Sequence, residues 1–336
     1  MFRRHSTTDW FLARVPRPAE WPRSNKAQPP TSHPPTATHG RSSSQSHRAI
    51  PLDERTWKPS SDLRQSRSHS HRTAGAGGAT PAGTWSTTGG SNKKWSTSSA
   101  GTVTTVNWTS GNDAVFSAGT DATGAYTVTV SGTQNVSSIK VQAGSPTLGT
   151  GVINFSDTTP DILVASGSTL TFGSALTSSN NSLNLGSATF TGTTVFSANT
   201  TLTGTVNLAG GTLQLSGSSY TFGTLNITGN STIDFAGTTN LNVTTFNISA
   251  GVTLNILNWA AAADYFYATN WTGATYNTMG SAPMNQVTFN GFTAAQTGWD
   301  SFDNQIRPNV PEPSTYGALF IGALTALFAW RRRARA

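Results

Sequence analysis

The 336-residue chain has no cysteine, and charged side chains make up only 10% of it, against about 25% in an average soluble protein. Without cysteine there is no disulfide and no thiolate ligand for a metal. Residues 73–310 also have no histidine and no glutamate, which excludes a histidine-dependent catalytic triad there. Stability must therefore come from packing and hydrogen bonds.

The few carboxylates of the central region are aspartates, mostly isolated at turns. Asp157 with Asp161, and Asp300 with Asp303, are close enough in sequence to bind Ca²⁺ through oxygen, but aspartate is also a common turn residue. A polysaccharide lyase needs a cluster of carboxylates and a basic proton acceptor, whereas Lys140 lies ahead of the repeated segments described below. We predict no catalytic residue, no cofactor and no metal site.

The formal net charge of +7 comes from the two ends of the chain. Residues 1–72 hold 13 Lys and Arg against 5 Asp and Glu, and residues 311–336 hold 4 Arg against 1 Glu. Residues 73–310 hold 4 basic residues against 8 Asp, so the central region is mildly acidic. A nucleic-acid partner is not expected, because such a partner requires basic side chains on the folded surface.

Residues 1–72 are rich in Arg, Ser and Pro and show no hydrophobic period, so we predict a disordered basic arm. This segment has no recognisable signal peptide, because the apolar run beginning at Trp10 is interrupted by Arg14 and Pro16. Two interpretations remain open. The segment is a wrongly assigned start of the protein, or it is a basic arm that contacts an anionic lipid or polymer.

Residues 73–258 consist of short segments in which apolar and polar residues alternate, and several of these segments begin with glycine. Five such segments begin at Gly167, Gly186, Gly211, Gly229 and Gly251. A spacing of about 20 residues with two or three short strands is the length of one coil of a β-solenoid. We predict an all-β, right-handed parallel β-helix with apolar residues inside and Thr, Ser and Asn outside. A β-sandwich is the competing fold, since evenly spaced strands serve it too.

Aromatic residues gather at both ends of this repeated region. Trp85, Trp95 and Trp108 precede a Gly-Asn-Asp turn, and residues 259–309 contain Trp271 among several tyrosines. We interpret the first group as an N-terminal cap and residues 259–309 as an aromatic-rich C-terminal cap, which would cover the open ends of the sheets. The alternative is that these four tryptophans stack on glycan rings, since their flat faces are apolar while the ring nitrogen can stay in water.

The last residues carry the strongest signal. Ser314–Trp330 contains no charge, and a helix of this length spans roughly 26 Å, slightly less than the hydrocarbon core of a bilayer. Four arginines follow: Arg331, Arg332, Arg333 and Arg335. We predict one transmembrane helix within residues 310–336, held in the inner membrane with these arginines on the cytoplasmic side and the rest of the chain exported.

The sequence Pro311-Glu312-Pro313, followed by a short apolar helix and an arginine cluster, resembles the PEP-CTERM sorting signal of Gram-negative bacteria. The resemblance implies that an exosortase-like membrane protease processes the tripeptide. It also implies that the part of the chain ahead of the signal, the body, reaches the cell surface or extracellular matrix. The tryptophan-containing block 83–117 also resembles the start of autotransporter-associated β-strand-repeat proteins. We therefore expect an exported, non-catalytic structural or adhesive protein. The alternative is a carbohydrate-binding or carbohydrate-active β-helix with an extracellular polysaccharide as partner.

Overall fold

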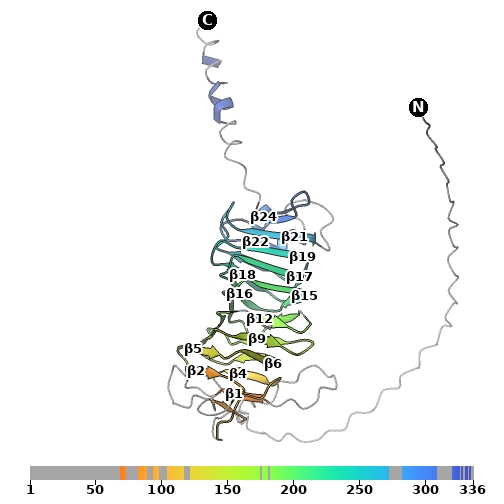
Figure 1. The fold of residues 1–336 in the computed structure, drawn as a ribbon. Helices are drawn as coiled ribbons and strands as arrows, with labels where there is room; N and C mark the ends of the chain where they lie inside the picture. Colours follow the sequence, from red (N-terminus) through yellow and green to blue (C-terminus); the bar gives the residue numbers. More distant parts are fainter. Residues whose placement is uncertain are drawn as a thin grey trace, which may run out of the picture. The chain divides into compact units, whose positions relative to one another are not determined.

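The computed structural model describes residues 82–88, 94–97, 104–116, 122–174, 176–180, 182–271, 282–308, 320–325, 327, 330, 331 and 333, and the backbone of residues 69–72. Within these residues the chain winds into successive coils that lie one on the next (Figure 1). Each coil pairs with its neighbour through parallel β-bridges, as in β5 with β8 and β17 with β19. The predicted parallel β-solenoid is confirmed, and the β-sandwich alternative is wrong.

The coils build three sheets. The twelve-stranded sheet A contains, in spatial order, β23 (Thr297–Asp300), β24 (Gln305–Pro308), β21 (Tyr265–Trp271), β19 (Asn240–Ile248), β17 (Ser219–Ile227), β15 (Thr200–Leu208), β13 (Leu183–Leu185), β10 (Asp161–Val164), β7 (Ile139–Val141), β4 (Asp113–Phe116), β1 (His69–Arg72) and β3 (Trp95–Ser96). The nine-stranded sheet B contains β2 (Gly83–Trp85), β5 (Ala125–Val130), β8 (Ser145–Gly149), β11 (Thr169–Phe172), β14 (Thr193–Phe196), β16 (Gly211–Leu215), β18 (Ser231–Phe235), β20 (Leu254–Leu257) and β22 (Val287–Phe289). The three-stranded sheet C contains β6 (Thr133–Val136), β9 (Val152–Phe155) and β12 (Leu176–Ser178).

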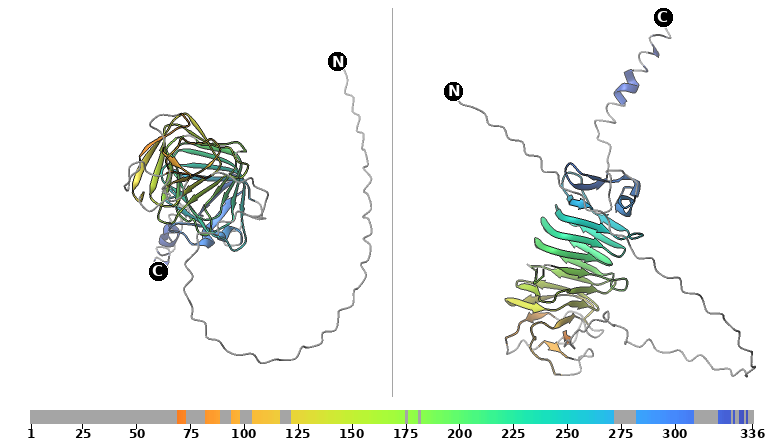
Figure 2. Two further views of the ribbon diagram at one scale, coloured as in Figure 1. Left: turned by 90° about the horizontal axis from the view of Figure 1, so that it is seen from below. Right: turned by 90° about the vertical axis from the view of Figure 1, so that its right-hand side faces the viewer.

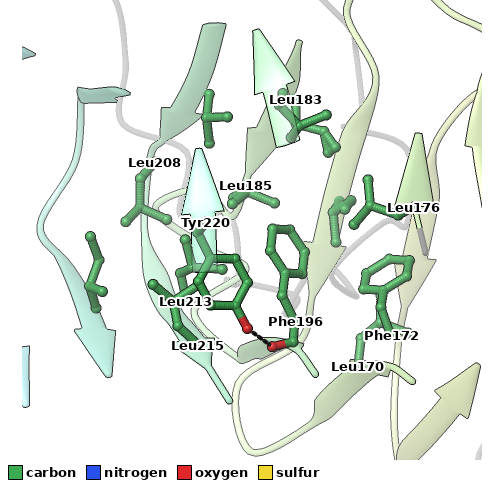
Figure 3. Packing of buried hydrophobic residues seen from close by; sticks show 14 of the residues in the cluster. Leu170, Phe172, Leu176, Leu183, Leu185, Phe196, Leu208, Leu213, Leu215 and Tyr220 are labelled. Carbon is green, nitrogen blue, oxygen red and sulfur yellow. Dashed lines mark hydrogen bonds between the residues drawn. The ribbon is translucent and has the colours of Figure 1, made fainter. Parts of the chain in front are cut away.

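The core is a set of columns in which apolar side chains from successive coils stack on one another. Alternation along each strand sends every second side chain inward, and β5 shows it most plainly, with burial alternating residue by residue. One column in sheet A consists of Leu183, Val206, Leu225, Phe246 and Trp271, all of them buried. Figure 3 shows how the buried side chains of several neighbouring coils pack against one another.

The cross-section of the stack changes along its length. In the first coils three separate strands form the sides, as β7, β8 and β9 do. The strands β15, β17 and β19 of sheet A are nine residues long and occupy two sides, with a register shift between Leu202 and Thr205. At the same corner of the next coil stands Gly223, where an added Cβ would collide with the carbonyl oxygen of Thr203. The bend therefore requires glycine at this position.

A ladder of side-chain amides runs along the outside of sheet A. Asn184, Asn207, Asn226 and Asn247 occupy equivalent positions on β13, β15, β17 and β19. Each of the last three donates from Nδ2 to Oδ1 of the preceding asparagine, at 2.7–2.8 Å. Asn184 in turn donates to Oδ1 of Asp161 at 2.9 Å. Because a carboxylate accepts hydrogen bonds and donates none when ionised, Asp161 is a suitable first member of the ladder.

Both ends of the stack are covered. At the N-terminal end, β3 pairs antiparallel with β1, so the last strand of sheet A reverses direction. At the C-terminal end, β24 pairs antiparallel with both β21 and β23. Two short 3-10 helices, η1 (Met284–Gln286) and η2 (Ala294–Gln296), accompany this hairpin. Antiparallel closure and capping hinder the addition of a further strand from another molecule.

Three expectations from the sequence differ from the structure. Residues 69–72 form β1 and pair with β4, although they lie in the segment predicted to be disordered. Parallel stacking continues through β21 and β22, so the stack extends beyond residue 258. The predicted strand at 186–190 is a loop, in which the Ser187 Oγ accepts a hydrogen bond from the backbone N–H of Phe190. The strand of that coil is β14, which begins at Thr193.

Replacing Asn207 with alanine should weaken the stack by about 1–2 kcal/mol, because the half-buried amide makes hydrogen bonds to both neighbouring coils. Chemical denaturation followed by circular dichroism measures the change. Asn240→Ala is the matched control, since Asn240 lies on the same sheet with an exposed side chain. Equal stability of the two variants would show that the ladder contributes nothing measurable.

Replacing Tyr220 with phenylalanine should cost about 1–3 kcal/mol. The buried Tyr220 hydroxyl donates to the carbonyl of Phe196 at 2.5 Å (Figure 3). It also accepts from the Gly217 N–H at 2.5 Å. The phenylalanine ring keeps the packing but leaves the Gly217 N–H without this acceptor. Thermal unfolding tests the prediction, with Tyr265→Phe as the control because the hydrogen bond of the Tyr265 hydroxyl is exposed.

Candidate functional site

The C-terminal tail, residues 310–336, is the first candidate site. Pro311, Glu312 and Pro313 lie outside the described residues, as do Arg332 and Arg335. The described residues of the tail are helical, and their large apolar side chains, among them Phe320, Ile321 and Trp330, are exposed. Arg331 and Arg333 are exposed at the end of this segment. A helix that presents apolar side chains to the outside needs an apolar partner or surface.

In the part of the chain that the structure describes, no helix combines the length and the apolar character needed to cross a bilayer. The transmembrane helix predicted within residues 310–336 falls partly outside the described residues and stays a prediction.

The tryptophans of the N-terminal end form one buried cluster. The rings of Trp85, Trp95 and Trp108 lie with centroids 4.6–5.0 Å apart, and Phe116 packs edge-on against two of them at 5.7 Å. Trp108 also donates from its ring nitrogen to the carbonyl of Asn135. This packing covers the first coil of the core and fixes the segment 108–112 across the edge of β6.

The proposed role of these tryptophans in glycan stacking is not compatible with their burial. Trp85 and Trp95 are 0% exposed, and Trp108 and Trp271 are 3% exposed. Trp271 packs edge-on against Phe246 at 5.1 Å. A sugar ring needs an open aromatic face, and these faces are occupied by neighbouring side chains. The sequence could not distinguish the two roles because both require flat aromatic residues at the end of a stack.

The acidic pair that the sequence offered for Ca²⁺ near the C-terminal end is occupied by an arginine. Arg307 forms ion pairs with Asp300 at 3.1 Å and with Asp303 at 2.9 Å, and it also donates to Gln305. A guanidinium between two carboxylates supplies the positive charge that a calcium ion would bring. These contacts join the two strands of the hairpin β23–β24.

The other acidic pair is divided between two structural roles. Asp157 accepts hydrogen bonds from Ser137 Oγ and from the Thr158 N–H, whereas Asp161 begins the asparagine ladder. Among the described residues, no group of three or more histidine, cysteine or acidic side chains is arranged to hold a metal ion.

Lys140 is the basic residue that a lyase mechanism would need. It lies on β7, which is a strand of one of the coils, whereas the sequence suggested a position ahead of the coils. Its Nζ lies 4.9 Å from the centroid of the Phe190 ring, and burial lowers the pKa of the ammonium group. A cation over an aromatic face is a stabilising contact, and it joins the loop 186–192 to β7, which lies two strands from β13 in sheet A.

Asp264 and Tyr267, to which the sequence pattern assigns no individual role, organise the C-terminal end. The buried Asp264 accepts hydrogen bonds from the backbone N–H groups of Thr239, at 2.8 Å, and Ala260, at 2.7 Å. It thereby ties the turn before β21 to the start of β19. Tyr267 is partly exposed and stacks on Tyr265 with ring centroids 5.6 Å apart and an interplanar angle of 3°. Partial burial raises the pKa of Tyr267, and Tyr265 and Asp303 raise it further while Arg307 lowers it.

Comparison with protein families matches the tail of the chain. Residues 309–333 match the PEP-CTERM protein-sorting motif. The matched range includes Pro311, Glu312 and Pro313, the apolar segment, and Arg331, Arg332 and Arg333. The motif implies export of the chain with membrane anchoring and processing by an exosortase, which is a membrane protein. Comparisons with curated proteins and with solved structures found no match, so the resemblance of block 83–117 to autotransporter-associated repeats stays a prediction.

Replacing Trp95 with alanine should destabilise the protein by about 3–5 kcal/mol, because a fully buried indole at the centre of the cluster would leave a cavity. Denaturant unfolding monitored by circular dichroism measures the loss. Phe302→Ala is the control, since Phe302 is 97% exposed. A small effect at Trp95 would contradict its role in covering the core.

Proposed function

We propose that the protein is an exported, non-catalytic structural or adhesive component of the cell surface or extracellular matrix. The observation that carries this proposal is the combination of a sorting motif at residues 309–333 with a capped parallel β-solenoid. A solenoid with closed ends is a rigid spacer, because each coil is bonded to the next along its whole length.

The chemistry of the body supports a role that needs no catalysis. Its aspartates are largely engaged in structural contacts, such as those of Asp264 with backbone N–H groups and of Asp300 with Arg307. Its buried polar groups join neighbouring coils, as Tyr220 does. These side chains stabilise the stack and leave few groups free to act as acid, base or nucleophile.

In the proposed sequence of events, the exported body is held at the inner membrane by the apolar segment 314–330. Arg331, Arg332, Arg333 and Arg335 stay on the cytoplasmic side, since clustered positive charge resists translocation. An exosortase-like protease acts at Pro311, Glu312 and Pro313. Two prolines within three residues keep this segment extended and accessible next to the membrane. The body then passes to the surface or matrix, where it contributes structure or adhesion.

Replacing Pro311, Glu312 and Pro313 together with alanine should abolish processing. In the source bacterium, mass spectrometry of the wild-type body should find a new C-terminus near these residues, and the variant should retain its arginine-rich end in the membrane fraction. Phe302→Ala, at an exposed position outside the matched motif, is the control. Normal release of the triple variant would contradict the proposed sorting step, and recovery of the intact wild-type chain from the cytosol would contradict the proposed export.

A further inference from the structure

The turn after β22 contains an asparagine followed by glycine, Asn290-Gly291, a pair that occurs once in the 336 residues. β22 is the last strand of sheet B, at the blue end of the stack of strands in Figure 2. The Phe292 N–H donates to the carbonyl of Phe289 at 3.0 Å, and Gly291 has a φ of 87°. A type II β-turn requires such a positive φ at its third residue, which glycine adopts without strain. The pair therefore forms the centre of an ordered turn.

Two groups of this turn are free to react with each other. Asn290 and Gly291 are exposed. Within the described residues, neither the side-chain amide of Asn290 nor the N–H of Gly291 makes a hydrogen bond. Glycine also has no side chain to shield its nitrogen. The Gly291 nitrogen is therefore open to attack the amide carbon, Cγ, of the asparagine that precedes it.

Asn230 is an exposed asparagine in another turn, directly before β18, and its environment differs. The N–H of Ser231, the residue that follows it, donates to the carbonyl of Thr253 at 3.1 Å. The Asn230 Oδ1 accepts from the Thr253 N–H at 2.9 Å. Hydrogen bonds to the next coil thus hold both groups that would have to react, which makes Asn230 an internal comparison for Asn290.

The asparagines of the ladder are protected in a different way. Their side-chain amides bond to one another, and they lie within paired strands. The residue that follows each of them is a leucine or an isoleucine, with a branched side chain beside the backbone nitrogen. The amides that join the coils are therefore shielded from the reaction that the turn after β22 permits.

We propose that Asn290 is a site of spontaneous deamidation and that the change loosens the C-terminal end of the body. The Gly291 nitrogen loses its proton to a solvent base and attacks Cγ of Asn290. A C–N bond forms and the side-chain nitrogen leaves as ammonia, which gives a cyclic succinimide. Water then opens this ring at either of its carbonyl carbons. The product is aspartate or isoaspartate, each with a new carboxylate, and nothing is oxidised or reduced.

The isoaspartate product lengthens the main chain by one carbon atom between β22 and η2. The Phe292 N–H then no longer meets the carbonyl of Phe289, and the partly buried Phe292 ring loses its fixed place against the core. Further along the chain, Thr297 Oγ1 donates a buried hydrogen bond to the carbonyl of Val287 at 2.6 Å. Because this bond joins the two sides of the altered turn, the segment 291–297 should open more easily after the change.

The test is incubation of the purified full-length chain, kept in detergent, in mildly alkaline buffer, with peptide mapping by mass spectrometry at intervals. Asn290 should convert to aspartate and isoaspartate many times faster than Asn230, and the ladder asparagines should stay intact. The conversion should accelerate as the pH rises, because the attacking nitrogen must lose its proton. Asn290→Gln should show no conversion on the same time scale, since the longer side chain closes a ring less readily.

Hydrogen exchange of residues 284–297 measures the structural consequence. The aged wild-type chain should exchange several-fold faster in this segment than the fresh chain, whereas ageing should not change the exchange of Asn290→Gln. Freshly purified Asn290→Asp is the matched control for charge. It carries the new carboxylate on an unaltered main chain and should exchange like the fresh wild-type chain.

Two results would overturn the inference. One is that Asn290 keeps its amide, or converts no faster than Asn230. The other is that ageing accelerates exchange equally in the wild-type chain and in Asn290→Gln, or in neither. The inference goes beyond the proposed function, because the reaction needs water alone. The assay uses purified protein, so neither result bears on export or sorting.

Discussion

The register between successive coils is the constraint on which the whole structure depends. In the stack, lateral backbone hydrogen bonds join a strand to the coils before and after it, so a slip of one residue would turn every inward side chain outward. The repeated units differ in length, however. Side-chain hydrogen bonds between equivalent positions span 19 residues in one coil and 23 in another. The loops absorb this difference, as the long loop 186–192 does, and the strands stay aligned.

The ladder and the core columns act together to hold this register. On the inside, Leu225 must meet Val206 and Phe246, and on the outside Asn226 must meet Asn207 and Asn247. Apolar stacking alone tolerates many pairings, because Leu, Val and Phe are all apolar and pack adaptably. An amide that donates to one neighbour and accepts from the other fits one alignment. The outer ladder thus adds specificity to a core that supplies most of the stability.

The sequence predicted the parts of this fold that depend on a period. Alternation and glycine spacing indicate the solenoid because each coil repeats the same pattern, and Leu213 and Leu215, or Ile233 and Phe235, point inward as expected. The prediction failed where local pattern and tertiary pairing disagree. The segment at Gly186 alternates like a strand, yet Phe190 leaves the sheet to cover Lys140. Such a contact joins residues from different coils, and no local pattern contains it.

For the candidate sites, too, the sequence predicted what is contiguous in the chain and not what depends on tertiary packing. The sorting motif is a contiguous signal, so Pro311, Glu312 and Pro313 could be found from the sequence and the family comparison agrees. The tryptophans could be located but not assigned, because burial decides between a cap and a binding platform, and burial follows from the packing of Trp85 on Trp95 and Trp108. The ladder was visible in the sequence as a Thr or Ser two residues before an Asn in successive repeats. That these asparagines bond to one another follows only from the pairing register of β13, β15, β17 and β19.

The scarcity of charged side chains in residues 73–310 connects the fold to the conditions outside the cytoplasm. Ion pairs weaken as salt rises, whereas stacked apolar columns and amide ladders depend little on ionic strength. A protein displayed at the cell surface would meet changing salt and pH, and residues 73–310 carry no histidine and few carboxylates whose titration would affect stability. The ion pairs of Arg307 with Asp300 and Asp303 lie at the rim of the stack. The uncharged centre, residues 162–233, contains no ion pair on which its register could depend, which is the property that the proposed rigid spacer would need.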